Sequence, residues 1–248
     1  MSPQFRKIDA ATLHYLPASD RHPADTYFHF SFAAYHNPDN IQFGALRVLN
    51  DDNVNPHDGF GRHPHRDMEI VSYVVSGKLT HWDNATKVEA TLGRGDVQVV
   101  TAGTGVWHSE LNRDDEWCRF LQIWILPPAA NLPVRYAQRR FDPEARLNRL
   151  LHIVGNTDNR HEVPLYLNQD VNLYVSELQD PEARVTFTVQ AGRQAYVNNI
   201  EGRVAVKGVA ELDERDALEV VGPAELEFSL AGPTAHFIVI EMAESAER

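Results

Sequence analysis

The stretch that decides the fold begins with Gly59-Phe60-Gly61-Arg62-His63-Pro64-His65-Arg66-Asp67-Met68-Glu69 and ends with Thr101-Ala102-Gly103-Thr104-Gly105-Val106-Trp107-His108-Ser109-Glu110-Leu111-Asn112. Each segment carries two metal-binding side chains that lie two residues apart: His63 with His65, and His108 with Glu110. Residues two apart in a β-strand point to the same face of the strand. If both segments are strands that meet across a barrel, the four side chains surround one point and predict a metal site.

This set of side chains also indicates which ions the site prefers. Three imidazoles and one carboxylate suit a divalent first-row transition metal. The carboxylate favours harder ions, so we expect Fe(II), with Mn, Co, Ni, Cu or Zn as alternatives. Burying the four side chains without any ion would cost several kcal/mol unless all of them were hydrogen-bonded. A purely structural zinc is less consistent with the residues, because such sites usually close their shell with four ligands, often cysteines.

The composition is that of an ordinary globular protein. The chain has 248 residues, enough for one large domain or two of common size, and a formal net charge of −12 that disfavours a nucleic-acid surface. Its one cysteine, Cys118, excludes an intrachain disulfide and fits a reducing compartment. We find no secretory signal, and no apolar run approaches the roughly 20 residues of a membrane span. We therefore expect a cytoplasmic protein that binds neither nucleic acid nor membrane.

Turn residues separate short β-branched and aromatic segments along most of the chain, as in Glu69–Val75 and Val97–Val100. This pattern predicts an antiparallel sandwich or barrel. Between residues 131 and 149 prolines and arginines accumulate, and Asp142 can cap a short helix with Pro143 in its first turn. Short strands resume at Leu150. We predict a metal-binding domain over residues 1–130, a linker over 131–149 and a second domain over 150–248.

A faint internal repeat relates the two halves. Val74–Leu79 is similar to Asn199–Val204, so the second half is predicted to be a further copy of the same barrel. Where the first copy has His63 and His65, the second has Thr188 and Gln190. We therefore expect the second domain to hold no metal.

Five segments together resemble the pirin branch of the cupins: Leu46–Asp52, Gly61–Glu69, Gly95–Gln98, Thr101–Glu110 and Leu121–Trp124. The resemblance is strong over residues 40–130 and weak beyond. A lone His-x-His motif is poor evidence, but His-Pro-His-Arg followed by His-Ser-Glu at this spacing is highly specific. The resemblance implies an all-β bicupin, with two β-barrel or jelly-roll domains in tandem, a short helical linker and one metal in the N-terminal domain.

The resemblance implies that His63, His65 and His108 are the histidine ligands and that Glu110 is the carboxylate ligand. The general cupin pattern instead takes its glutamate four residues after the second histidine, where Glu69 stands. Glu69 also has the correct strand parity. We favour Glu110, with Glu69 as the alternative ligand or as a supporting acid.

Some bacterial members of this family resemble quercetin 2,3-dioxygenases, and the C-terminal half here is similar to theirs. This implies a metal-dependent dioxygenase that cleaves a flavonol such as quercetin with O2 and releases carbon monoxide. The substrate would be a small aromatic molecule, and Glu110 would be the catalytic base that removes the proton of its acidic enol. Phe60, Met68, Trp82 and Trp107 are candidates for an apolar pocket. The alternative is a pirin-like metal- or redox-sensing regulator that modulates a protein partner.

Overall fold

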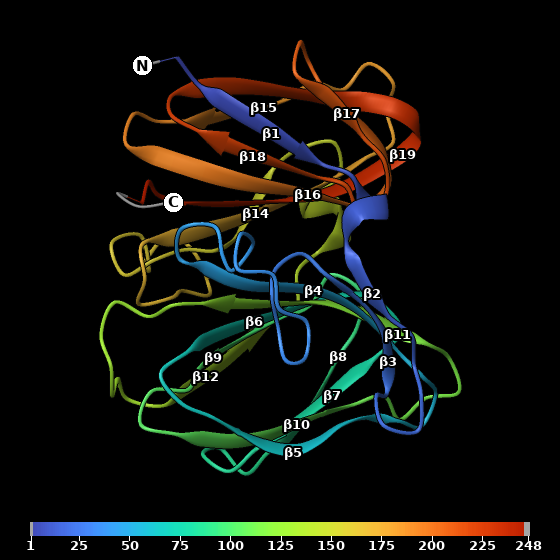
Figure 1. Ribbon diagram of the computed structural model, residues 1–248, viewed down its shortest axis with the longest axis vertical. Coiled ribbons are helices and arrows are strands. Elements are labelled where there is room, and N and C mark those ends of the chain that lie inside the picture. The colour runs from blue at the N-terminus through green and yellow to red at the C-terminus, as the bar shows by residue number, and fades with distance from the viewer. Residues whose placement is uncertain (1, 246–248) are drawn as a thin grey trace. The chain divides into compact units, whose positions relative to one another are not determined.

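The computed structural model describes residues 2–245, and almost all of their regular structure is β-strand. The expected all-β class is therefore confirmed. The chain forms two compact units: an N-terminal unit of Leu13–Phe141 with Leu167–Gln169, and a C-terminal unit of residues 2–12, 142–166 and 170–245 (Figure 1). In the described part of the chain, no helix has the length and apolar character needed to cross a membrane.

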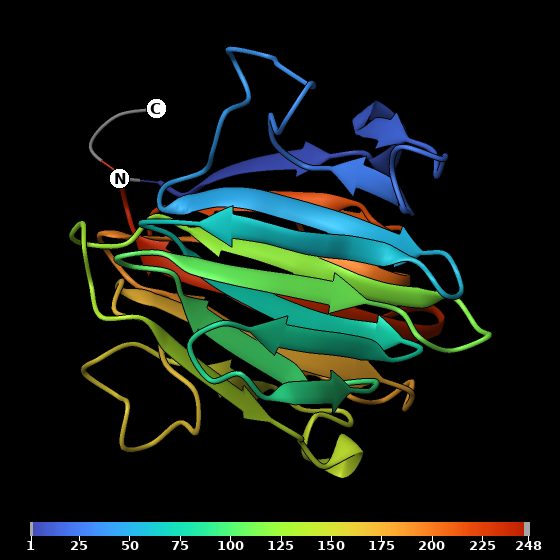
Figure 2. The ribbon, with the colours of Figure 1, turned by 90° about the horizontal axis from the view of Figure 1, so that it is seen from below.

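The N-terminal unit is built from two antiparallel sheets. Its strands are β2 (His14–Leu16), β3 (Ala24–Phe28), β4 (Leu46–Val54), β5 (Gly59–His65), β6 (Glu69–Ser76), β7 (Leu79–Asp83), β8 (Glu89–Leu92), β9 (Val97–Thr101), β10 (Val106–Leu111), β11 (Cys118–Ile125) and β12 (Arg135–Arg139). The larger sheet has the order β12-β9-β6-β11-β4-β3-β2, and the smaller one has the order β5-β10-β7-β8. Figure 2 shows these strands, coloured from blue to green, running side by side.

The burial of individual strands explains their places in the sheets. Every residue of β6 except Ser76 is buried, and its nearly continuous apolar run is typical of a strand covered on both faces. Accordingly, β6 lies inside its sheet, between β9 and β11. In contrast, β5 is an edge strand of the smaller sheet. An edge strand tolerates Pro64, which has no N–H to give to the ladder.

The pairing of β5 with β10 positions the predicted ligands. His63 lies opposite His108, and a shift in register follows between His108 and Glu110. Gly59, at the start of β5, has a φ of 149°, and a Cβ there would lie 2.5 Å from the Glu110 carbonyl oxygen. Only glycine permits this close approach of the two backbones. Gly59 therefore allows β5 to lie close to β10, the strand that carries His108.

Cys118 lies in one of the apolar clusters of this unit. The buried members of the cluster are Ala24, Val54, Val74, Leu79, Leu92, Cys118 and Phe120. Burial is the main reason why the pKa of the Cys118 thiol rises to about 12. The thiol is therefore protonated at neutral pH and packs as a small apolar side chain.

The C-terminal unit consists of one antiparallel sheet. Its strands are β1 (Gln4–Ile8), β13 (Leu151–Val154), β14 (Val171–Leu178), β15 (Val185–Val189), β16 (Arg193–Val206), β17 (Ala210–Leu212), β18 (Ala217–Val221) and β19 (Ala224–Ala243). The main order is β1-β18-β16-β19-β14-β13, with β15 on β19 and β17 on β16. The register of β16 against β19 shifts on either side of Gly202, and such irregularities bend a sheet around its core.

Three features differ from the expected domain organisation. β1 pairs with β18 and so belongs to the C-terminal unit, although we had assigned residues 1–130 to one domain. β12 pairs with β9 inside the stretch that we read as a linker. The expected linker helix is only a single 3-10 turn, η2 (Pro143–Ala145), although the Asp142 carboxylate does accept a hydrogen bond from the Glu144 N–H. A second such turn, η1, spans Ala10–Thr12. The exact domain boundaries stay a prediction.

Candidate metal centre

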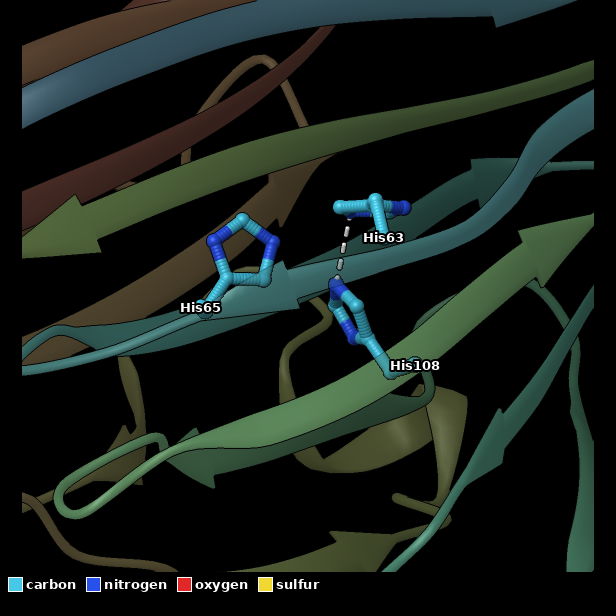
Figure 3. Close-up of side chains that lie close together, drawn as sticks. All are labelled: His63, His65 and His108. Carbon is cyan, nitrogen blue, oxygen red and sulfur yellow. Dashed lines mark hydrogen bonds between the residues drawn. The ribbon is translucent and has the colours of Figure 1, made fainter.

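Three imidazoles, two from β5 and one from β10, lie together in the N-terminal unit (Figure 3). The ring centroid of His108 is 4.5 Å from that of His63 and 4.7 Å from that of His65, and the two β5 rings are 4.8 Å apart. Figure 3 shows the three rings directed toward a common space. The structure therefore brings together the three predicted histidines, whose role as ligands stays a prediction.

The geometry of these nitrogens fits a metal ion. The Nε2 atoms of His63 and His108 are 2.9 Å apart. Two nitrogens that bind one ion at about 2.0–2.1 Å and at right angles would be roughly 2.9 Å apart. The His63 Nδ1 atom lies 2.7 Å from the Gly61 carbonyl oxygen. A hydrogen bond donated there leaves the Nε2 lone pair available, as is usual for metal-binding histidines.

The environment also keeps the imidazoles in the form that binds metals. Burial, followed by the neighbouring imidazoles of His108 and His63, lowers the pKa of His65 to about 3. Burial is also the largest cause that lowers the pKa of His108 to about 3, with His63 and His81 adding to it. Metals bind neutral imidazole, so neither side chain must lose a proton at neutral pH before it can coordinate.

The carboxylate of Glu110 is buried and held by three neutral donors. Its Oε1 atom accepts hydrogen bonds from Ser72 Oγ at 2.9 Å and Gln98 Nε2 at 2.8 Å. Its Oε2 atom accepts one from Gln122 Nε2 at 2.6 Å. The carboxylate is therefore fixed beside His108, with unused acceptor capacity on Oε2.

Glu110 belongs to a second group of ligand atoms that lie within 4.8 Å of one another, formed with His81 and His108. The group of His63, His65 and His108 does not contain it at that limit. Two ligands on opposite sides of one ion are about 4.2 Å apart when each bond is about 2.1 Å. Glu110 must therefore shift toward the β5 histidines if it is to share an ion with all three.

Glu69 has a different environment. It is fully buried, and its carboxylate accepts hydrogen bonds from the Asn168 backbone and side chain, the Gln169 N–H and the Thr101 hydroxyl. It belongs to neither group of potential ligands. These contacts hold the segment Leu167–Gln169 against β6 and β9, which agrees with the supporting role that we gave Glu69 as an alternative.

His81 is a residue that the sequence analysis did not select. Its Nε2 atom lies 3.1 Å from Asp83 Oδ2, and its ring stacks on Tyr136 at a centroid distance of 4.6 Å. Among the described residues, the buried Nδ1 atoms of His81 and His108 have no hydrogen-bond partner. The signal in the sequence was the spacing of His81 and Asp83, two residues apart in one strand.

A cavity of about 230 Å³ opens beside the histidines. It is lined by His22, Thr26, Phe28, Phe32, Asn50, Asp52, Phe60, His63, His65, Glu110, Gln122 and Trp124. Only one of the four predicted apolar residues, Phe60, is among them. The other three lie elsewhere. The side chain of Trp107 is half exposed, and Met68 packs against the apolar cluster that contains Ile70. The Trp82 ring is covered by Arg62, whose Cζ atom lies 4.0 Å from the ring centroid.

The sequence matches two known families, one for each half. Residues 12–125 match the family model described as Pirin, and residues 154–242 match that of the quercetinase C-terminal cupin domain. A quercetin 2,3-dioxygenase of Escherichia coli K12 is 37% identical over 186 residues, which cover 75% of this chain and 78% of the relative. The chain belongs to the pirin family. A pirin-like protein of Caulobacter vibrioides is 35% identical over 216 residues, or 87% of this chain and 90% of the relative.

Solved structures of the pirin family share the fold. The bacterial pirin YhhW of Escherichia coli, in complex with nickel(II), has a TM-score of 0.86 and 29% identity, and the match covers 98% of this chain and all of that one. The resemblance seen in the sequence and the expected pair of cupin domains are thus confirmed. Fold and family, together with the cluster of histidines and Glu110, indicate a metal ion, and the named relatives support a quercetinase-like function.

The pirin-family motifs did not reveal the aromatic part of the cavity wall. Phe28 and Phe32 precede the motifs, and Trp124 ends the last of them, on β11, but was not selected as a pocket residue. Gln98 and Gln122, which hold Glu110, are polar residues within largely apolar strands. A buried polar side chain inside an apolar strand needs a partner, and that requirement was the available signal.

Proposed function

We propose that the protein is a metal-dependent dioxygenase that cleaves a flavonol such as quercetin with O2 and releases carbon monoxide. The observation that carries this proposal is the position of the histidine cluster at an aromatic cavity. His63 and His65 line the same cavity as Phe28, Phe32 and Trp124. A flat aromatic substrate that packs against these rings would have its polar groups within reach of the metal ligands.

The cofactor in this proposal is one divalent transition metal held by His63, His65, His108 and Glu110. Fe(II) is our first choice, with Mn, Co, Ni, Cu or Zn as alternatives. When bound, such an ion supplies Lewis-acid and redox chemistry to the cavity. The electrons for O2 reduction come from the substrate itself.

Glu110 is the base in this scheme. It lines the cavity, and its Oε2 atom accepts only one hydrogen bond, from Gln122. The proton of the substrate's enol therefore moves to Oε2, while Ser72 and Gln98 hold Oε1 in place. A base positioned within hydrogen-bonding distance of the proton that it removes accelerates such a step by typically about 10²–10⁴-fold.

The aromatic side chains bind and orient the substrate. Phe32 and Trp124 meet edge to face, with ring centroids 5.1 Å apart, and the Phe28 ring lies 6.0 Å from that of Phe32. These rings form a continuous apolar surface that excludes water from the reacting face of the substrate. Water exclusion strengthens the electrostatic interactions in the site.

The test combines metal analysis with turnover. The purified protein is analysed for metals, and the same preparation is assayed for quercetin loss and carbon monoxide release under air and under nitrogen. We expect near-stoichiometric metal and a loss of quercetin that requires O2. In the Glu110→Gln variant, which keeps the size of the side chain but replaces one carboxylate oxygen with an NH2 group, the rate falls by about 10²-fold or more. Bound metal without oxygen consumption contradicts the proposal and favours the sensing role.

A further inference from the structure

A second polar pair faces the cavity from the other sheet. Asn50 and Asp52 lie two residues apart on β4, so both side chains project from one face of that strand. Both line the cavity, together with His63 and His65 of β5. β4 belongs to the larger sheet and β5 to the smaller one. The cavity therefore lies between a histidine pair on one sheet and an amide–carboxylate pair on the other.

The residues of this pair have unused acceptor atoms. Asn50 is 4% exposed, and its Oδ1 atom is buried without a hydrogen-bond partner among the described residues. Asp52 is 3% exposed and accepts one hydrogen bond, from Thr26 Oγ to its Oδ1 atom at 2.5 Å. Buried polar atoms without partners are uncommon, and each costs roughly 1–3 kcal/mol. Asn50 Oδ1 is such an atom, and Asp52 accepts a single hydrogen bond, so this part of the cavity wall indicates that a ligand supplies further donors.

A short hydrogen-bond chain holds the carboxyl group in place. Thr26 Oγ, which donates to Asp52, also lies 2.8 Å from His22 Nε2. Thr26 and His22 both line the cavity. The carboxyl group is therefore oriented before a ligand arrives, which lowers the entropy cost of binding one.

A donor from a ligand would also favour the charged form of Asp52. Burial, opposed by the Thr26 hydrogen bond and assisted by the charges of Asp51 and Glu110, raises the pKa of Asp52 to about 7. A hydrogen bond donated to a carboxylate favours its charged form and lowers its pKa. A hydroxyl group in the cavity would therefore stabilise the Asp52 carboxylate, which burial alone destabilises.

We propose that Asn50 and Asp52 accept hydrogen bonds from ring hydroxyl groups of the substrate, so that the cavity selects hydroxylated aromatic molecules. The inference rests on the proposed function, because it names what the same cavity recognises in a flavonol. Phenolic hydroxyls are hydrogen-bond donors, and the aromatic side chains of the cavity accept the ring that carries them. A site built around such hydrogen bonds rejects analogues that lack the hydroxyl, because its acceptors then stay unpaired.

The test is equilibrium binding under nitrogen, where turnover does not occur. The probes are quercetin, kaempferol and galangin, which share the 3-hydroxyl group and carry two, one and no hydroxyls on the pendant ring. For the metal-loaded wild type, we expect quercetin to bind at least about tenfold more tightly than galangin, with kaempferol between them. In Asn50→Leu and Asp52→Leu, which keep the side-chain size without polar atoms, this ratio falls toward one.

Three further variants separate recognition from folding. Asp52→Asn keeps an acceptor and the shape of the side chain, so it retains most of the preference even if Asp52→Leu does not fold. Thr26→Val removes the donor that orients Asp52 and weakens the preference, whereas Thr26→Ser restores it. Metal content is measured for every variant, and it equals that of the wild type.

The outcomes distinguish this inference from the proposed function. Equal affinity of the wild type for quercetin and galangin, or no binding of either, overturns the hydroxyl recognition. Preferential binding of quercetin without oxygen consumption supports the recognition and contradicts the dioxygenase. Oxygen-dependent cleavage at equal rates and affinities for all three flavonols supports the dioxygenase and contradicts the recognition.

Discussion

The Nε2 atoms of His63 and His108 lie 2.9 Å apart, on neighbouring strands that pair these two residues directly. This relationship results from the register of β5 against β10. A slip of one residue in that register would turn the ligands of one strand to the opposite face of the sheet. The distance between two side chains of the candidate metal centre is therefore set by backbone pairing.

Removal of His63 tests the metal centre. In His63→Ala, we expect the affinity for the metal to fall by more than about 100-fold. This exceeds the loss of about 10–100-fold that is typical when a residue that only hydrogen-bonds to a ligand is removed. Competition with a chelator measures the affinity, and elemental analysis measures the content. The control is His57→Ala, because His57 is exposed and pairs with Asp115 outside the cluster. Unchanged metal affinity in His63→Ala would exclude this residue as a ligand.

His81 is predicted to support His108. The His81 and His108 rings are 5.4 Å apart, and the unpartnered Nδ1 atoms of both become satisfied if one donates to the other. In that arrangement, Asp83 Oδ2 interacts with Nε2 on the opposite side of the His81 ring. In His81→Phe, which keeps the stacking on Tyr136, we expect metal affinity to fall by about 10–100-fold. Chelator competition provides the measurement, and wild-type affinity would show that His81 only fills space.

Acid is predicted to destabilise the metal-free protein through its buried histidines. The pKa values of His65 and His108 are about 3 in the folded protein, against 6.5 for a histidine that is fully exposed to water. Between these values the unfolded chain binds protons that the folded chain does not, so stability falls as the pH drops from 6.5 toward 3. Each histidine contributes up to about 1.4 kcal/mol per pH unit in that window.

The measurement for this pH dependence is urea unfolding of chelator-treated protein across the same window. His65→Gln removes one of the two groups, so its stability is expected to depend less steeply on pH than that of the wild type. Parallel pH curves for the two proteins would show that His65 does not titrate in this way.

The two glutamates are predicted to respond differently to the same substitution. Glu69→Gln disturbs a buried carboxylate that accepts from Asn168, Gln169 and Thr101. We expect a loss of about 1–3 kcal/mol of stability, seen as a lower Tm, with full metal content. Glu110→Gln reduces metal content or affinity instead. A loss of metal in Glu69→Gln alone would reverse our assignment of the carboxylate ligand.

Local pattern was sufficient for the histidines but not for the carboxylates. The i, i+2 spacing of His63 and His65 fixes a common face in any strand, so their proximity followed from the sequence once a strand was assumed. Glu69 and Glu110 both satisfied strand parity. They differ only in their neighbours, because Asn168 and Gln169 reach Glu69 from a segment about 100 residues away. No local pattern contains that contact.

The sequence by itself determined the all-β class, the family and the identity of the three clustered histidines. These features depend on strand periodicity and on motifs that span a few residues. Only the tertiary structure decided that β1 pairs with β18, that Arg135–Arg139 forms a strand, and that Asn50 and Asp52 face the histidines across the cavity. The physical reason is that strand pairing and cavity walls join residues far apart in the chain, and their partners are chosen by packing and hydrogen bonding over the whole unit rather than by local sequence.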